Sequence, residues 1–134
     1  MSSGRSNVYD LHFESRPGFM HITVAGVRSP ETFAQYTAEI IGGCELKGCD
    51  RILIEDRLVG PRMSPLDYYS VLPTVSQRAR SVIRAIALVD EQIGDVGYFA
   101  ETVAVNRGLN IGVFTTLKDA ENWLLGEAGR PVAS

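Results

Sequence analysis

The sequence predicts an α/β domain in which an N-terminal β-hairpin joins a mostly parallel sheet of about five strands, covered by about four helices. Two segments rich in β-forming residues open the chain, and apolar runs then alternate with helical stripes that begin at serine or threonine caps. With 134 residues and 45% hydrophobic content, the chain is long enough to bury one core and too short to suggest two.

The expected hairpin comprises VYDLHFES (8–15) and FMHITVAGV (19–27), separated by the turn signal Arg16-Pro17-Gly18. His12 and His21 fall inside these strands. We expect structural rather than catalytic roles for both, because no partner residue stands near either one in the sequence.

The first helix is expected to begin at Ser29-Pro30-Glu31, which supplies a cap, a first-turn proline and a first-turn acid. An apolar stripe then runs from Phe33 to Cys44, and Gly42-Gly43 with Gly48 indicates a weak helix end and a loop. The following run, 51–59, carries three consecutive apolar residues, Ile52 to Ile54. Such a run is typical of a central strand that is covered on both faces.

Ser64-Pro65-Leu66-Asp67 repeats the cap pattern and opens a second helical stripe that continues to Ile83. Pro73 removes a backbone amide from this stripe, which predicts one bent helix or two pieces.

The remaining elements alternate in the same way. We expect a buried strand at 84–90, a helix capped by Asp95 and closed by Gly108, a strand at 109–116, and a final helix. That last helix begins at Thr116 with Asp119 as its capping acid and ends at Gly126. The domain is therefore expected to span residues 8–126, with disordered tails at 1–7 and 127–134.

Charge is unevenly distributed along the chain. The net charge is -3, yet the segment 51–84 has six arginines and three acids, which makes it +3 and leaves -6 for the remainder. The total excludes a generally basic nucleic-acid binder, while the segment is either a solvated helix surface or a local positive face.

No apolar run approaches the roughly 18 residues that a membrane span needs, and no signal-peptide pattern opens the chain, so a cytoplasmic location is expected. The only cysteines, Cys44 and Cys49, are expected to be structural thiols. With His12 and His21 they do not readily form a four-ligand zinc site, and no metal or cofactor is expected.

The stretch RGLNIGVFTTLKDAENWL (107–124) resembles the close of a STAS-type domain, the fold of bacterial anti-sigma factor antagonists. More closely, FAETVAVNRGLNIGVF (99–114) and the pattern of Ala120, Trp123 and Leu124 are similar to the divergent STAS/SEC14-like branch. The resemblance covers roughly residues 8–126 and implies a non-enzymatic binding module.

The two branches imply different partners. In the antagonist branch, a serine at the start of the helix after the central strand is phosphorylated by a partner kinase. Ser64 stands at the corresponding place, although Met63 replaces the acid that precedes it. The STAS/SEC14-like branch implies instead a carrier or sensor of an apolar, lipid-like ligand, with peripheral membrane contact.

Both readings place the contact surface in the loop and bent helix at residues 57–83. The candidate binding residues are Arg57, Arg62, Met63, Ser64, Tyr68, Tyr69 and Leu72. They mix apolar and basic groups, as an interface with anionic headgroups does, although Leu66, Tyr69 and Leu72 also have the spacing of a core stripe. Pro73 would allow a hinge over a pocket lined by Tyr69 and Leu72. A homodimer is left open.

An enzymatic alternative rests on carboxylates at strand ends. Glu55 and Asp56, then Asp90 and Glu91, then Thr115 and Thr116 lie near the carboxyl ends of expected strands. Ligands of open α/β sheets gather at these ends, where carboxylates hold Mg²⁺ or act as acid and base. No nucleophile elbow, P-loop or dinucleotide-binding glycine motif is present. A binding module with no catalytic residue and no nucleic-acid partner is therefore the preferred hypothesis.

Overall fold

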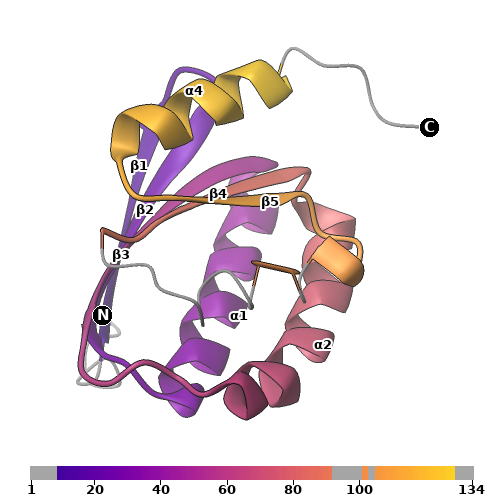
Figure 1. Ribbon diagram of the computed structural model, residues 1–134. Helices are drawn as coiled ribbons and strands as arrows, with labels where there is room; N and C mark the ends of the chain where they lie inside the picture. The colour runs from indigo at the N-terminus through magenta and orange to yellow at the C-terminus, as the bar shows by residue number, and fades with distance from the viewer. Residues whose placement is uncertain (1–8, 92–100, 103–104, 129–134) are drawn as a thin grey trace.

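The computed structural model describes residues 9–91, 101–102 and 105–128, and it confirms the predicted α/β architecture (Figure 1). The sheet contains β1 (Tyr9–Arg16), β2 (Phe19–Val27), β3 (Arg51–Val59), β4 (Ala85–Val89) and β5 (Ile111–Phe114), in that spatial order. β1 and β2 form the predicted antiparallel hairpin, and every later pair of neighbours is parallel. β3 occupies the centre, as predicted.

Helices cover both faces of the sheet. α1 (Pro30–Lys47) and α2 (Pro65–Val82) lie side by side on one face, and α4 (Leu117–Ala128) lies on the other (Figure 1). The helix expected between Asp95 and Gly108 falls largely outside the described residues, although 101–102 and 105–106 are helical.

Each face of the sheet has its own core, and β3 contributes to both. Ile52 and Leu53 are completely buried on opposite faces. The first core joins alternate residues of β1 to β4 with α1 and α2. The second joins Leu53 and the small residues of β4 with Ala120 and Leu124 of α4. Both helix layers therefore depend on the same central strand.

The predicted helix starts are confirmed. The Ser29 hydroxyl accepts a hydrogen bond from the Thr32 amide at 3.0 Å. At Ser64, the hydroxyl accepts from the Asp67 amide at 3.2 Å, and the Asp67 carboxylate accepts from the Ser64 amide at 3.1 Å. Thr116 accepts from the Asp119 amide at 3.2 Å.

Three predicted helix interruptions are wrong or only partly right. α1 continues through Gly42-Gly43 to Lys47, where Gly48 ends it with a φ of 70°; the glycines allow close packing, since the Phe13 ring lies against Gly43. α2 remains a single helix through Pro73. α4 passes Gly126 and ends at Ala128.

The cysteines fit the predicted structural role. Both thiols are free, and Cys44 is buried. Burial, reinforced by the neighbouring Cys49, raises the pKa of the Cys44 thiol well above its usual range, so this side chain is kept neutral and unreactive. Among the described residues, no helix combines the length and the apolar character of a membrane span.

Candidate functional site

A groove of about 920 Å³ opens at the edge where the parallel strands have their carboxyl ends. We call it the C-edge groove; Arg28 and residues 55–62, 89–91 and 115–117 line it. The sequence predicted that Glu55, Asp56, Asp90, Glu91, Thr115 and Thr116 would meet at this edge, and they do. Open α/β sheets bind their ligands at this position.

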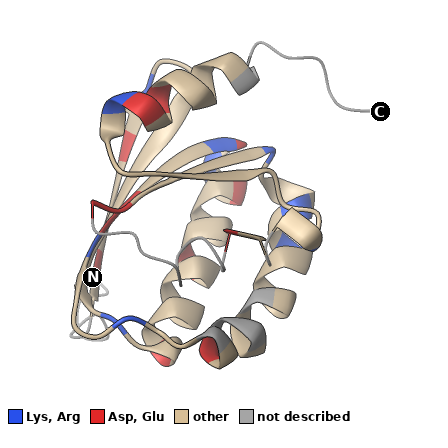
Figure 2. Cartoon of the chain, in the orientation of Figure 1, with Lys and Arg blue, Asp and Glu red and all other residues tan. Residues whose placement is uncertain are grey.

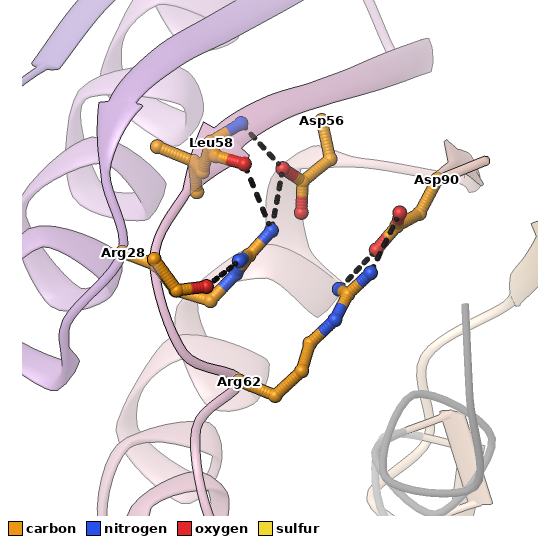
Figure 3. A network of polar contacts seen from close by, with 6 residues as sticks. Arg28, Asp56, Leu58, Arg62 and Asp90 are labelled. Atoms are coloured by element: carbon orange, nitrogen blue, oxygen red, sulfur yellow. Dashed lines mark hydrogen bonds and ion pairs between the residues drawn. The ribbon is translucent and has the colours of Figure 1, made fainter. Parts of the chain in front are cut away.

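Arg28 fixes the loop between β3 and α2 (Figure 3). It follows β2 directly, and its amide bonds to the Val59 carbonyl at 2.8 Å. Its guanidinium donates to the carbonyls of Gly60 and Leu58 at 2.8 and 3.2 Å and lies 3.4 Å from the Asp56 carboxylate. Because the guanidinium fork satisfies several oxygens together, the loop keeps a single path out of β3.

A second arginine joins this loop to the next strand. Arg62 donates to Asp90, directly after β4, through its two terminal guanidinium nitrogens, Nη1 and Nη2, with Nη2 lying 3.0 Å from Oδ1 (Figure 3). Asp90 is 6% exposed, so its charge requires a partner inside the fold. The two arginine–aspartate pairs therefore set the shape of the groove wall.

The pKa of Asp56 is raised. Burial of the carboxyl is the main cause, and the nearby Asp90 adds to it; the Leu58 amide, Arg28 and Arg62 act in the opposite direction. The Leu58 amide donates to Asp56 Oδ1 at 2.9 Å. The effect of desolvation on the Asp56 pKa thus exceeds the opposing effect of the two arginines. Keeping Asp56 ionised in the folded protein therefore has an electrostatic cost.

A different polar cluster lies on the opposite face of β3. Glu55 accepts from His21 Nε2 at 3.0 Å through one oxygen and from Arg57 Nε at 2.7 Å through the other. His21 is buried, and its Nδ1 has no hydrogen-bond partner. This pairing was not predicted from the sequence, because it depends on the register of β2 against β3, which places His21 beside Leu53 and Thr23 beside Glu55.

The predicted binding residues fall in different environments. Arg57 and Arg62 line the groove, and the Arg57 side chain is 64% exposed. Ser64 is exposed at the start of α2, whereas Met63 is 5% exposed and packs inside. Tyr68, Tyr69 and Leu72 lie within α2, but their side chains are outside the described part of the structure.

The arginine-rich segment does not form a uniform positive face. Arg51, Arg57, Arg62, Arg78 and Arg84 all stand within 4.0 Å of a carboxylate. Figure 2 shows basic and acidic residues interspersed over several elements. This distribution fits a solvated surface, whose charges serve solubility and local pairing, better than it fits a local positive face.

The arrangement of the carboxylates at the C-edge groove does not favour the alternative of a metal-assisted enzyme. Glu55 and Asp56 point to opposite faces of β3, and Asp56 and Asp90 each bind an arginine. Among the described residues, no three histidine, cysteine or acidic side chains are grouped so that they could hold a metal ion.

A smaller cavity of about 290 Å³ lies between α1 and α2. Its lining is mainly apolar, with Ala34, Ala38 and Ile41 from α1 facing Val71 and Val75 from α2, and Arg78 at its margin. This volume is at the lower limit of ligand cavities, which are roughly 300–1,000 Å³.

The fold of this chain is similar to that of a protein of known structure. The structure matches the crystal structure of an uncharacterised DUF3478-family protein with a SpoIIAA-like fold from Shewanella loihica PV-4, with a TM-score of 0.55 and 18% sequence identity. The match covers 87% of this chain and 93% of that one. No protein-family model and no curated protein matches the sequence. The chain therefore has a SpoIIAA-like fold, the fold of the STAS-type anti-sigma factor antagonists, and the resemblance in its sequence is confirmed at the level of the fold.

Proposed function

We propose that this protein is a non-enzymatic regulatory module that binds a protein partner at the C-edge groove and the adjoining start of α2. The observation that carries the proposal is a set of exposed apolar side chains at this edge. Val59 and Leu117 line the groove and are 63% and 37% exposed, Val27 beside Val59 is 53% exposed, and Leu66 in the first turn of α2 is 78% exposed.

The charges around these residues favour binding over chemistry. Asp56, Asp90 and Glu55 already accept hydrogen bonds from arginines of the same chain, so they are not poised to take a proton from a substrate. The exposed apolar residues instead resemble the centre of a protein interface, with Arg57 in the surrounding polar rim.

A lipid-like ligand is the weaker candidate. Its best support is the apolar cavity between α1 and α2. An acyl chain with its headgroup needs considerably more room than about 290 Å³, and α2 would have to move away from α1 to provide it. The C-edge groove, in contrast, is already open at about 920 Å³ and requires no such movement.

Ser64 is the proposed point of regulation. Its hydroxyl is exposed and accepts only the Asp67 amide among the interactions described above, while the Asp67 carboxylate lies 3.1 Å from the Ser64 amide. A phosphate would add negative charge beside Asp67, and Arg57 and Arg62 already bind Glu55 and Asp90. The N-terminus of α2 tolerates this added charge, and phosphorylation is therefore expected to act mainly by repelling an acidic partner surface.

Site-specific photo-crosslinking tests the protein-partner proposal. A photoreactive residue at Val59 or Leu66, in the chain expressed in its native host, should give a covalent adduct with a defined protein. Excess unlabelled protein should compete the adduct away, and Arg57→Glu should weaken it. The matched control is Leu125, which is 47% exposed on α4 and should give no such adduct. A lipid adduct in native mass spectrometry, without any protein adduct, would overturn the proposal.

A further inference from the structure

The outer edge of β1 is a strand edge that pairs with nothing else in the described part of the chain. β1 has 8 residues, twice the 4 of β5 at the opposite edge. Such an edge presents unpaired backbone groups and is a template for another strand. Its side chains therefore decide whether a second strand is repelled or accepted.

One face of β1 carries a series of polar and charged side chains. Asp10, His12, Glu14 and Arg16 alternate along the strand and are all exposed. The only ion pair among them, Arg16 with Glu14 at 3.4 Å, is exposed on both sides and is therefore weak. Charges on edge strands commonly prevent association, but the order of these charges has a different consequence.

We propose that β1 pairs with β1 of a second copy, antiparallel, about a two-fold axis through Phe13. In this register Asp10 lies opposite Arg16 of the second copy, and His12 lies opposite its Glu14. The symmetry generates both pairs twice, so every charge on this face meets a complementary group. Directly opposite residues in an antiparallel pair are close enough for such contacts.

The neighbouring registers do not have this property. A two-fold axis through His12 would set Asp10 opposite Glu14, and an axis through Glu14 would oppose two glutamates and place His12 against Arg16. Like charges directly opposite each other destabilise a strand pair. The sequence of β1 is therefore self-complementary in one of these three registers and repulsive in the others.

The other face of β1 supplies apolar surface. Leu11 and Phe13 are only partly buried and pack at the margin of the core. With the axis at Phe13, the two phenylalanine rings lie side by side across the new strand pair. The dimer would cover side chains that one chain alone leaves half open, which adds a hydrophobic contribution to the charge pairing.

α1 provides an independent observation. Its Glu39 binds the Tyr9 hydroxyl, and its Gly43 lies against the Phe13 ring, so this side of the helix faces β1. Leu46 follows on the same side, three residues after Gly43, yet it is 90% exposed. α1 contacts β1 and β2 equally and therefore lies over this pair of strands. With strands ~4.8 Å apart, joining the sheets would set the two α1 helices about 10 Å apart, which is helix-packing distance. Leu46 would then be covered by the second copy.

The dimer would leave the C-edge groove accessible. The two-fold axis reverses the direction of every strand in the second copy, so the parallel strands that form the C-edge groove point toward opposite ends of one continuous sheet in the two copies. A second copy at β1 is thus compatible with partner binding but does not depend on it.

A charge-swap experiment tests both the interface and its register. Sedimentation equilibrium should show a reversible dimer of the wild-type chain. Asp10→Arg and Arg16→Asp should each weaken it about tenfold, because each places like charges opposite each other twice, and the double variant should restore dimerisation. Leu46→Ser should also weaken it, whereas Leu66→Ser, which changes another highly exposed leucine on α2, should not.

Every other result contradicts the proposal. If the wild-type chain were monomeric across the dilution series, there would be no dimer. If the single variants had no effect on dimerisation, the dimer would not form through β1. If the double variant still dimerised weakly, the proposed register, with Asp10 opposite Arg16, would be wrong. Circular dichroism of each variant establishes that the fold is kept, and none of these readouts depends on the partner tested by photo-crosslinking.

Discussion

Asp56 is an acid that the fold buries beside a buried arginine, with 11% and 8% of the two side chains exposed. Folding raises the pKa of Asp56, mainly through burial. When folding raises the pKa of an acid, the folded state binds the proton more tightly than the unfolded chain does. The resulting stability is fully present below the unfolded-state pKa and is lost as the pH rises through the folded-state pKa.

Asp56→Asn should remove this pH dependence, because an amide oxygen still accepts from the Leu58 amide and from Arg28 without carrying a charge. Urea unfolding of both proteins between about pH 3 and pH 8 gives the measurement. The wild type should lose stability relative to the variant as the pH rises from the lower end of this range. A relative gain with rising pH would mean that the Arg28 attraction exceeds the cost of burial.

Prediction from the sequence succeeds for some of these residues and fails for others. It located Asp56 and Asp90 at the correct edge, because the ends of parallel strands can be read from apolar runs. It missed Arg28, because a residue between a strand and a helix cap shows no periodicity, and its role depends on which strand lies beside β2. The His21–Glu55 contact was missed for the same reason, since it requires the β2–β3 register.

At the scale of single elements, α2 depends on its cap. Ser64→Ala should reduce the free energy of unfolding by about 1 kcal/mol, since the Asp67 amide loses its acceptor. Ser70→Ala is the matched control, because the Ser70 hydroxyl donates only to a carbonyl one turn earlier, 2.8 Å away. Chemical denaturation compares the two. Equal effects of both substitutions would show that the Ser64 hydroxyl contributes nothing as a cap.

α1 offers a comparison between adjacent glycines. A methyl group at Gly43 would stand 2.8 Å from the Phe13 ring, whereas at Gly42 the nearest atom is 3.8 Å away on Arg78. Gly42→Ala should stabilise the protein by up to about 1 kcal/mol through helix propensity. Gly43→Ala should destabilise it by about 1–3 kcal/mol, because α1 or the ring must shift.

Thermal and urea unfolding measure both glycine effects. Combining Gly43→Ala with Phe13→Leu should recover part of the loss, since the smaller side chain makes room for the methyl group. Stabilisation by both single substitutions would contradict the close approach of α1 to β1.

Most elements could be predicted because each has a local signal: caps at Ser29, Ser64 and Thr116, and the turn at Pro17-Gly18. The errors also have physical reasons. Gly42-Gly43 and Gly126 weaken a helix locally, but tertiary packing overrides such weak preferences. Pro73 lies within α2 without dividing it, because the helix is held on both sides of the proline by its cap and by buried Ala79.

At the scale of the whole molecule, the central strand couples two cores that do not touch each other. Ile52 packs below α1 and α2, while its neighbour Leu53 packs below α4. A domain of this size with one shared sheet is expected to unfold in a single cooperative transition. The helix layers should therefore not melt separately.

This coupling can be measured with the single tryptophan of the chain, Trp123, which lies 5.6 Å from Phe114 between ring centroids in the core below α4. Ile40→Ala in the first core and Leu124→Ala in the second each remove a fully buried side chain, at a cost of about 2–5 kcal/mol. Each should lower the midpoints of tryptophan fluorescence and of far-ultraviolet circular dichroism together. If Ile40→Ala shifted the circular dichroism midpoint but left the fluorescence midpoint unchanged, α4 and its strands would form an independent unit, and the shared strand would not transmit the loss.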